Sequence, residues 1–159
     1  IIRGRMNLVS MHTNLDKAPG GVADELAASL NLREVCSYGA LRTGTLKKRM
    51  PLRDWVRGLP FQTGRICDAG KDVLKVGACP GSGMEYWQQA RDFGCDTMVT
   101  GDVRYHAALD ALEDGMNVVD LGHFGTEELI LKPLAARLGR ELKGVAVRAH
   151  RGRDVFSSL

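Results

Sequence analysis

Apolar and polar residues alternate along the chain with two different periods. Short runs of apolar and β-branched residues predict strands at 73–79, 97–102 and 117–122, an extended segment at 36–46, and flanking strands at 6–12 and 145–149. Apolar residues at helical spacing predict helices at 21–32, 52–59, 83–93, 104–114 and 126–142. Because strands and helices follow one another in turn, the pattern predicts an α/β protein. We expect two layers, with a mostly parallel or mixed sheet and packed helices.

Glycine and proline residues set the ends of several of these helices. Gly94 and Gly115 follow two of the helical stretches and predict their ends. Pro133 falls inside the last stretch, where a residue without a backbone N–H interrupts the hydrogen-bond pattern of a helix. We therefore expect a kink or a break after the first turn of that helix.

Length and composition are those of one folded domain that spans residues 1–159. The chain has 159 residues, of which 44% are hydrophobic and 26% charged, so the composition excludes a disordered chain. No apolar run approaches the roughly 20 residues of a membrane span, and no signal-peptide pattern opens the sequence. These features predict a cytoplasmic protein without a membrane partner.

The charge and the cysteines suggest no special chemistry. The formal net charge is only +3, and basic residues gather at 46–49 and 148–153. Nucleic-acid-binding surfaces usually carry a stronger basic stripe, so both clusters are interpreted as solvated segments. The four cysteines lie 31, 12 and 16 residues apart, which matches neither a CxxC metal knuckle nor a dense disulfide scaffold. Reduced, mostly buried thiols are expected.

Residues with ligand chemistry follow the predicted strands at their carboxyl ends. His12 and Asp16 come at and after the end of the first predicted strand, and His123 and Glu127 follow the strand at 117–122. In open α/β sheets ligands bind where these ends meet. Imidazole and carboxylate groups together suit divalent transition metals. We expect the four side chains to share one pocket.

Each of these residues also has a purely structural interpretation. Glu127 is an acid in the first turn of a helix, where the helix dipole favours negative charge. His123 is also compatible with a loop histidine that only makes a hydrogen bond, and Asp16 with an Asx turn. Their placement at neighbouring strand ends favours a shared site over these separate roles.

Two further segments at strand ends carry candidate groups. Gly81, Ser82 and Gly83 lie between a strand and a helix, where free backbone N–H groups bind phosphate or carboxylate. The segment lacks the lysine of a P-loop, and a tight strand–helix turn explains it equally well. His106 follows the segment TGD at 100–102; it either faces the same edge of the sheet or packs within the protein.

Three segments, in order, resemble the successive motifs of one known family: HTNLDKAPGGVADELA (12–27), VGACPGSG (76–83) and VTGDVRYHAALDALEDGMNVVDLGHFGTE (99–127). They resemble the type-two GTP cyclohydrolase I homologues, also called the Ngg-one-interacting-factor-three-like family. The resemblance implies a ring-shaped homohexamer with two divalent metal ions in each subunit, of zinc, manganese or iron. By position, Asp16, His123 and Glu127 resemble metal ligands of the family.

One feature of the family has no counterpart here. An adjacent histidine pair supplies two further ligands in the family, whereas this sequence contains no HH. The chain therefore resembles the C-terminal two-thirds of a family member. With three ligands carried over, we expect an incomplete centre that holds at most one divalent ion loosely.

The resemblance implies a dinuclear-metal-dependent hydrolase that acts on a nucleotide or another phosphorylated small molecule, with GTP cyclohydrolase as the leading activity. In that interpretation His12 or His106 transfers protons. Two alternatives stay open. One is a non-enzymatic scaffold that binds a protein partner and uses the metal structurally, and the other is a metal-dependent phosphoesterase.

Overall fold

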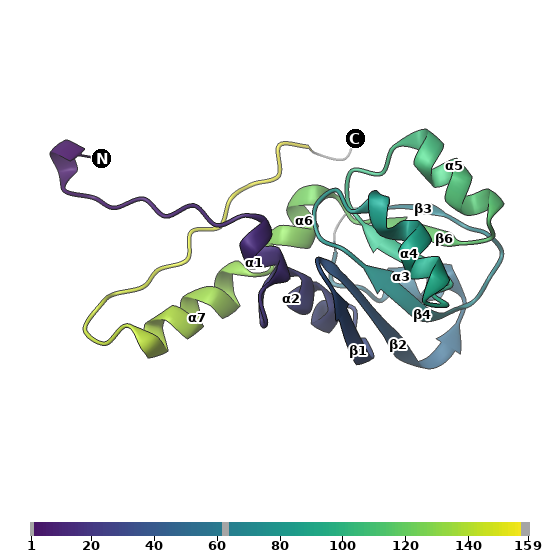
Figure 1. Ribbon diagram of the computed structural model, residues 1–159, viewed down its shortest axis with the longest axis horizontal. Helices are drawn as coiled ribbons and strands as arrows, with labels where there is room; N and C mark the ends of the chain where they lie inside the picture. Colours follow the sequence, from purple (N-terminus) through teal and green to yellow (C-terminus); the bar gives the residue numbers. More distant parts are fainter. Residues whose placement is uncertain (1, 62–63, 157–159) are drawn as a thin grey trace.

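The computed structural model describes residues 2–61 and 64–156, and within them six strands form one sheet in the order β1-β2-β4-β5-β6-β3 (Figure 1). The strands are β1 (Arg33–Tyr38), β2 (Leu41–Met50), β3 (Arg65–Cys67), β4 (Val73–Ala78), β5 (Thr97–Thr100) and β6 (Asn117–Asp120). Strands β4, β5 and β6 are parallel to one another, whereas β1, β2 and β3 join by antiparallel pairing. The predicted α/β class with a mixed sheet is confirmed.

Helices cover both faces of this sheet. In the described part of the chain the α-helices are α1 (Thr13–Lys17), α2 (Val22–Ser29), α3 (Leu52–Arg57), α4 (Trp87–Asp92), α5 (Tyr105–Glu113), α6 (His123–Glu128) and α7 (Leu131–Glu141), and the short 3-10 helices are η1 (Ile2–Gly4) and η2 (Met84–Tyr86). Side chains of α2 and α3 pack with Val119, while those of α4 and α5 pack with Val118. Neighbouring strand residues point to opposite faces, so each face has its own apolar core.

The last predicted helix is divided into two. Helix α6 begins at His123, three residues earlier than predicted, and α7 begins at Leu131. Pro133 lies in the first turn of α7, where a helix does not need its backbone N–H. A proline ring clashes with the carbonyl group four residues earlier in a continuous helix, and here that residue is Leu129, at the break. The predicted interruption is therefore present, although it precedes Pro133.

The two predicted flanking strands are wrong. Residues 6–11 are extended but pair with no strand in the described part of the chain, and residues 145–149 lie in a tail without helix or strand. Both segments have β-rich composition, but a strand also needs the free edge of a neighbour. In this sheet the edges are formed by β1 and β3.

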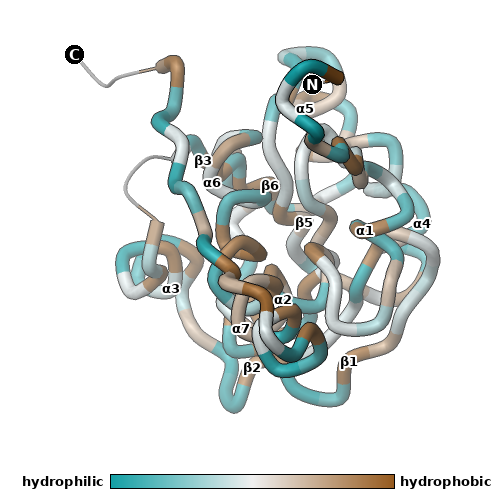
Figure 2. Tube along the Cα trace, turned by 90° about the vertical axis from the view of Figure 1, so that its left-hand side faces the viewer, coloured by the Kyte–Doolittle hydropathy of each residue, from teal (hydrophilic) through white to brown (hydrophobic). Residues whose placement is uncertain are grey.

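The flanking segments are thinly packed compared with the sheet. Helix α7 is fully described and none of its residues is buried. Figure 1 shows the N-terminal segment and α7 extending away from the sheet. The end of the described tail is hydrophobic (brown in Figure 2), and its Val155 and Phe156 are 89% and 81% exposed. These flanks matter because they supply one side of the candidate site.

The cysteines follow the sequence expectation only in part. Cys79 and Cys95 are buried free thiols, and burial raises the pKa of Cys79 to about 12. Cys67 is half-buried, whereas Cys36 is an exposed free thiol on the edge strand β1.

Candidate functional site

His123 lies between two carboxylates at the start of α6. Its Nδ1 atom is 2.7 Å from Oδ2 of Asp102, and its Nε2 atom is 3.1 Å from Oε1 of Glu127. Asp102 follows the end of β5, while Glu127 lies one helical turn after His123. The pairing of β5 with β6 therefore brings Asp102 to His123, and the helical repeat of α6 brings Glu127.

The two carboxylates fix both the orientation and the charge of the ring. The hydrogen bond with Asp102 raises the pKa of His123, partial burial opposes this rise, and the charge of Glu127 adds to it. With its Nδ1–H donated to Asp102, the ring presents Nε2 to the Glu127 carboxylate. A proton or a cation between Nε2 and Oε1 removes the repulsion between their lone pairs. The Asp102–His123 contact resembles the carboxylate–histidine pairs that orient metal-binding imidazoles.

Two glycines allow the backbone to approach these side chains closely. A Cβ atom on Gly81 would lie 2.6 Å from Oε1 of Glu127 and 3.3 Å from Nε2 of His123. A Cβ atom on Gly101 would lie 2.5 Å from the backbone nitrogen of His123. The next residue, Asp102, has a φ of 51°, a left-handed conformation that costs energy for a residue with a side chain. The backbone that follows β4 and β5 thus lies in close contact with the start of α6.

The turn at 79–83 does not offer a row of free amides. The N–H of Gly81 donates to Oγ1 of Thr126 at 3.0 Å, and the N–H of Gly83 donates to Oγ1 of Thr100 at 2.7 Å. Threonine hydroxyls therefore satisfy two amides that the sequence assigned to an anion. Ser82 is the exposed residue of the three and the one still facing solvent.

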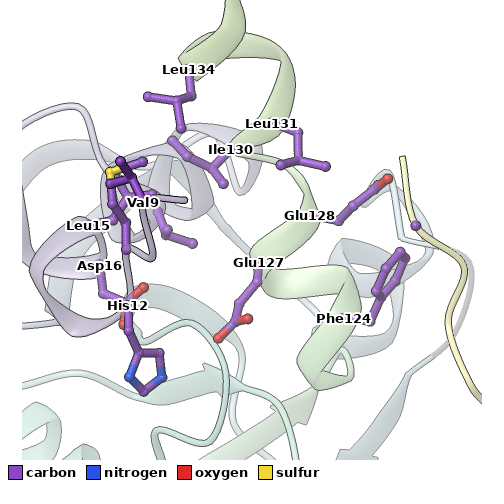
Figure 3. Close-up of a pocket in the computed structure, with 13 residues that line it drawn as sticks. Val9, His12, Leu15, Asp16, Phe124, Glu127, Glu128, Ile130, Leu131 and Leu134 are labelled. Carbon is purple, nitrogen blue, oxygen red and sulfur yellow. The ribbon is translucent and has the colours of Figure 1, made fainter. Parts of the chain in front are cut away.

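His12 and Asp16 lie across a pocket from Glu127. All three line a cavity of about 440 Å³ whose other walls are mainly apolar, and Figure 3 shows His12 and Asp16 on the side of α1 and Glu127 on the side of α6. Burial raises the pKa of Asp16, and the nearby rings of His12 and His123 oppose that rise. Asp16 is therefore close enough to both histidines to feel their charge.

His123 itself lines a second, adjoining cavity. This cavity of about 920 Å³ also contacts Asp102, Asp120 and Glu127, so Glu127 is a wall of both. His106 is absent from the described residues that line either cavity. It is exposed on α5, and its ring packs edge-on against Tyr105 with 5.5 Å between the ring centroids. Three of the four residues expected in one pocket, His12, Asp16 and Glu127, thus share a cavity, whereas His123 lines the adjoining one and His106 lines neither.

Two aspartates at this edge were not assigned a role from the sequence. The segment TGD at a strand end gave a signal for Asp102, but nothing in the sequence connected it to His123. Asp120 is buried and accepts hydrogen bonds from the N–H groups of Gly122, at 2.9 Å, and Val103, at 3.2 Å. It also forms an ion pair with Arg65. Asp120 thereby fixes the backbone next to His123 and Asp102.

The donors present match part of a metal centre. An imidazole nitrogen and a carboxylate oxygen face each other at His123 and Glu127, and Asp16 adds a carboxylate across the pocket. However, the described residues include no group of three or more His, Cys, Asp and Glu side chains placed to hold one ion. The ligand types fit a divalent transition metal, but these ligands are too few to complete its coordination shell.

This fold and site define a mixed-sheet α/β protein with a histidine–carboxylate cluster at the ends of its parallel strands. The chain belongs to the Duf34/NIF3 (NGG1p interacting factor 3) family, whose model matches residues 1–152. A Clostridium acetobutylicum protein named GTP cyclohydrolase 1 type 2 homolog is 32% identical over 142 residues, which cover 80% of this chain and 53% of that protein. The chain spans about half the length of the curated relatives it matches.

Solved structures have the same fold. Staphylococcus aureus protein SA1388 matches with a TM-score of 0.89 at 22% identity, over 99% of this chain and 71% of that one. Reduced HcgD from Methanocaldococcus jannaschii matches with a TM-score of 0.71 at 27% identity, over 84% of this chain and 56% of that one. Among the described residues, no helix combines the length and apolar character needed to cross a membrane.

Proposed function

We propose that this chain forms one wall of a divalent-metal-dependent hydrolase centre that acts on a nucleotide, with GTP cyclohydrolysis as the leading reaction. The observation that carries the proposal is the position of His123, oriented by Asp102 at 2.7 Å and facing Glu127 at 3.1 Å. The names of the curated relatives support the choice of a nucleotide. The ligand set is completed by groups outside this chain, such as the histidine pair expected from the family.

Each residue of the chain has a defined task in this proposal. His123 and Glu127 would hold the cation, and Asp16 would contribute a carboxylate from the facing wall. A bound divalent ion supplies Lewis acidity, which lowers the pKa of a water molecule there. His12 lines the same pocket and is the better placed of the two histidines proposed for proton transfer, because His106 lies apart.

Metal analysis and nucleotide turnover test the proposal together. The protein, together with the groups that complete its ligand set, is loaded with zinc, manganese or iron, dialysed, and analysed for bound metal by mass spectrometry; GTP turnover is followed by product fluorescence and mass. We expect His123→Ala to lose the retained metal and the turnover. The control is His150→Ala, because His150 is an exposed histidine of the tail. Equal metal retention in both variants would contradict the assignment of His123.

The same experiment separates the phosphoesterase from the cyclohydrolase. Release of phosphate from GTP or from a simple phosphate ester, with the purine ring intact, identifies a phosphoesterase. Opening of the purine ring identifies a cyclohydrolase. Both use the proposed centre, so the variants at His123 and Glu127 affect either activity.

A partner-binding scaffold is the second candidate, and the exposed apolar flanks favour it. The N-terminal segment exposes Leu8 and Val9 at 76% each, and the tail exposes Val155 and Phe156. Such surface usually becomes buried by association. We propose a homo-oligomer, with the hexameric ring expected from the family, as the assembly that covers it. Light scattering measures the mass, and a metal-loaded protein that assembles but turns over neither GTP nor a phosphate ester supports the scaffold.

A further inference from the structure

A third cavity lies between the end of α2, the second half of β2 and helix α3. We call it the basic groove; it has a volume of about 590 Å³ and is lined by Ala28, Leu30, Asn31, Leu32, Arg33, Leu46, Lys47, Lys48, Met50, Asp54, Trp55, Gly58 and Leu59. Of these described lining residues, none also lines either cavity at His123. The groove is therefore a surface that the proposed hydrolase centre does not use.

The walls of the basic groove differ in chemistry from its rim. Leu32, Met50 and Leu59 are half-buried side chains that also pack against the apolar core. At the rim, Arg33, Lys47 and Lys48 are exposed, and within the described residues none of them forms a salt bridge. Asp54 is the one acid among the described lining residues. The groove thus combines an apolar floor with unpaired positive charge.

The strand beside the groove is irregular at the residues that carry this charge. Strand β2 advances from Thr45 to Met50 while its partner β4 advances only from Lys75 to Val73, so three extra residues bulge out of the ladder. The pairing with β1 ends at Thr45, where Arg33 lies opposite. Bulges of this kind redirect side chains and end strand pairing. The segment 46–49 therefore lies in the irregular part of β2, and its Lys47 and Lys48 are exposed.

We propose that the basic groove is a docking site for an acidic peptide segment of a partner protein that carries apolar anchor residues. The rim supplies charge complementarity, and the floor accommodates the anchors. A nucleic acid fits less well, because Trp55 is only 6% exposed and the described residues of the groove therefore offer no aromatic platform for bases.

Fluorescence anisotropy with a labelled synthetic peptide tests this proposal. The probe is a short fluorescein-labelled peptide in which glutamate alternates with leucine. We expect saturable binding that weakens as the salt concentration rises, because rim charges are screened. The double variant Lys47→Glu/Lys48→Glu changes only exposed side chains and should weaken binding about tenfold. The matched control, Lys143→Glu/Arg148→Glu, makes the same charge change on the exposed tail and should bind as the unmodified protein does.

Three further probes make the outcome decisive. Peptides with lysine in place of glutamate, or with serine in place of leucine, should bind at least several-fold more weakly. A single-stranded RNA of similar length should also bind more weakly than the acidic peptide. Absence of saturable peptide binding, or binding that both double variants weaken equally, overturns the proposal. Tighter binding of the RNA that is lost in Lys47→Glu/Lys48→Glu assigns the groove to nucleic acid and overturns it as well.

Discussion

The two sides of the candidate site are built very differently. Asp102 lies in the short turn after β5, and His123 begins α6 shortly after β6; in both strands every residue is buried. His12 and Asp16 come from an exposed segment and the five-residue helix α1, in which no residue is buried although all are described. The first side is positioned by the packing of the sheet, whereas the second is held by a short helix against α2.

This difference indicates how the site depends on its surroundings. Segments with few buried apolar contacts open at low free energy, while core strands open only with the whole fold. The side of His123 and Asp102 is therefore preorganised. The side of His12 and Asp16 is expected to open more easily.

The largest expected loss of stability comes from removing the ion pair that holds α2, and with it α1, to the sheet. Arg42 on β2 is 1% exposed and pairs with Asp24 on α2. The substitution Asp24→Ala leaves a buried guanidinium without its charged partner, although its Nη1 still donates to the carbonyl oxygens of Gly39 and Leu41. We expect a loss of about 3 kcal/mol in the free energy of unfolding, at the lower end for a buried pair because Asp24 is partly exposed. Chemical denaturation measures it.

A surface pair provides the control for this variant. Asp54 and Arg57 are 3.4 Å apart, and both side chains are largely exposed. We expect Asp54→Ala to cost no more than about 0.5 kcal/mol. Equal decreases in the free energy of unfolding for the two variants would show that the Arg42–Asp24 pair does not stabilise the fold.

The second effect separates backbone strain from contact with the site. Gly81 has a φ of 63°, and a Cβ atom there meets Glu127. Gly70 has a φ of 75° and nothing within 4 Å of its Cβ position. Each substitution by alanine should cost roughly 1–2 kcal/mol through the left-handed backbone. Only Gly81→Ala should also displace Glu127 and weaken metal retention. Mass spectrometry after dialysis measures the retained metal. An equal loss of retained metal in Gly70→Ala argues against a role for Gly81.

The third effect is smaller and depends on pH. The folded protein raises the pKa of His123, chiefly through Asp102. The resulting stabilisation is complete below the unfolded pKa of about 6.5 and is lost as the pH rises through the higher folded pKa. In Asp102→Asn the pKa of His123 should fall towards its ordinary value. Titration of the ring by nuclear magnetic resonance measures the change, and an unchanged pKa would remove Asp102 from its orienting role.

The smallest effect concerns the tail. Arg151 forms a two-pronged ion pair with Glu128, at 2.8 and 2.7 Å, on the surface of α6. We expect Arg151→Ala to leave the unfolding midpoint unchanged but to speed proteolytic cleavage of residues 143–156, because the pair restrains only the tail. Limited proteolysis followed by mass spectrometry tests this, and Arg140→Ala on α7 is the control. A clear drop in the midpoint would show that the tail belongs to the cooperative fold.

Sequence patterns predicted the central units well because local signals and burial agree there. In β4, β5 and β6 the apolar runs are strands, and the glycines at 94 and 115 follow the helices that they were expected to end. For the two flanking segments the predicted strands were wrong. Residues 6–12 and 145–149 have the composition of strands, but pairing depends on a partner that their own sequence does not contain.

By itself, the sequence determined the α/β class, the family, and the candidates His12, Asp16, His123 and Glu127. Tertiary structure alone decided that His123 is oriented by Asp102, that threonine hydroxyls accept from the amides of Gly81 and Gly83, and that His106 lines neither cavity of the site. The spacing of apolar residues predicts which face of each helix or strand is buried, because that face is made of residues close in sequence. Contacts between the ends of different strands depend on how those elements pack, and no local pattern encodes them.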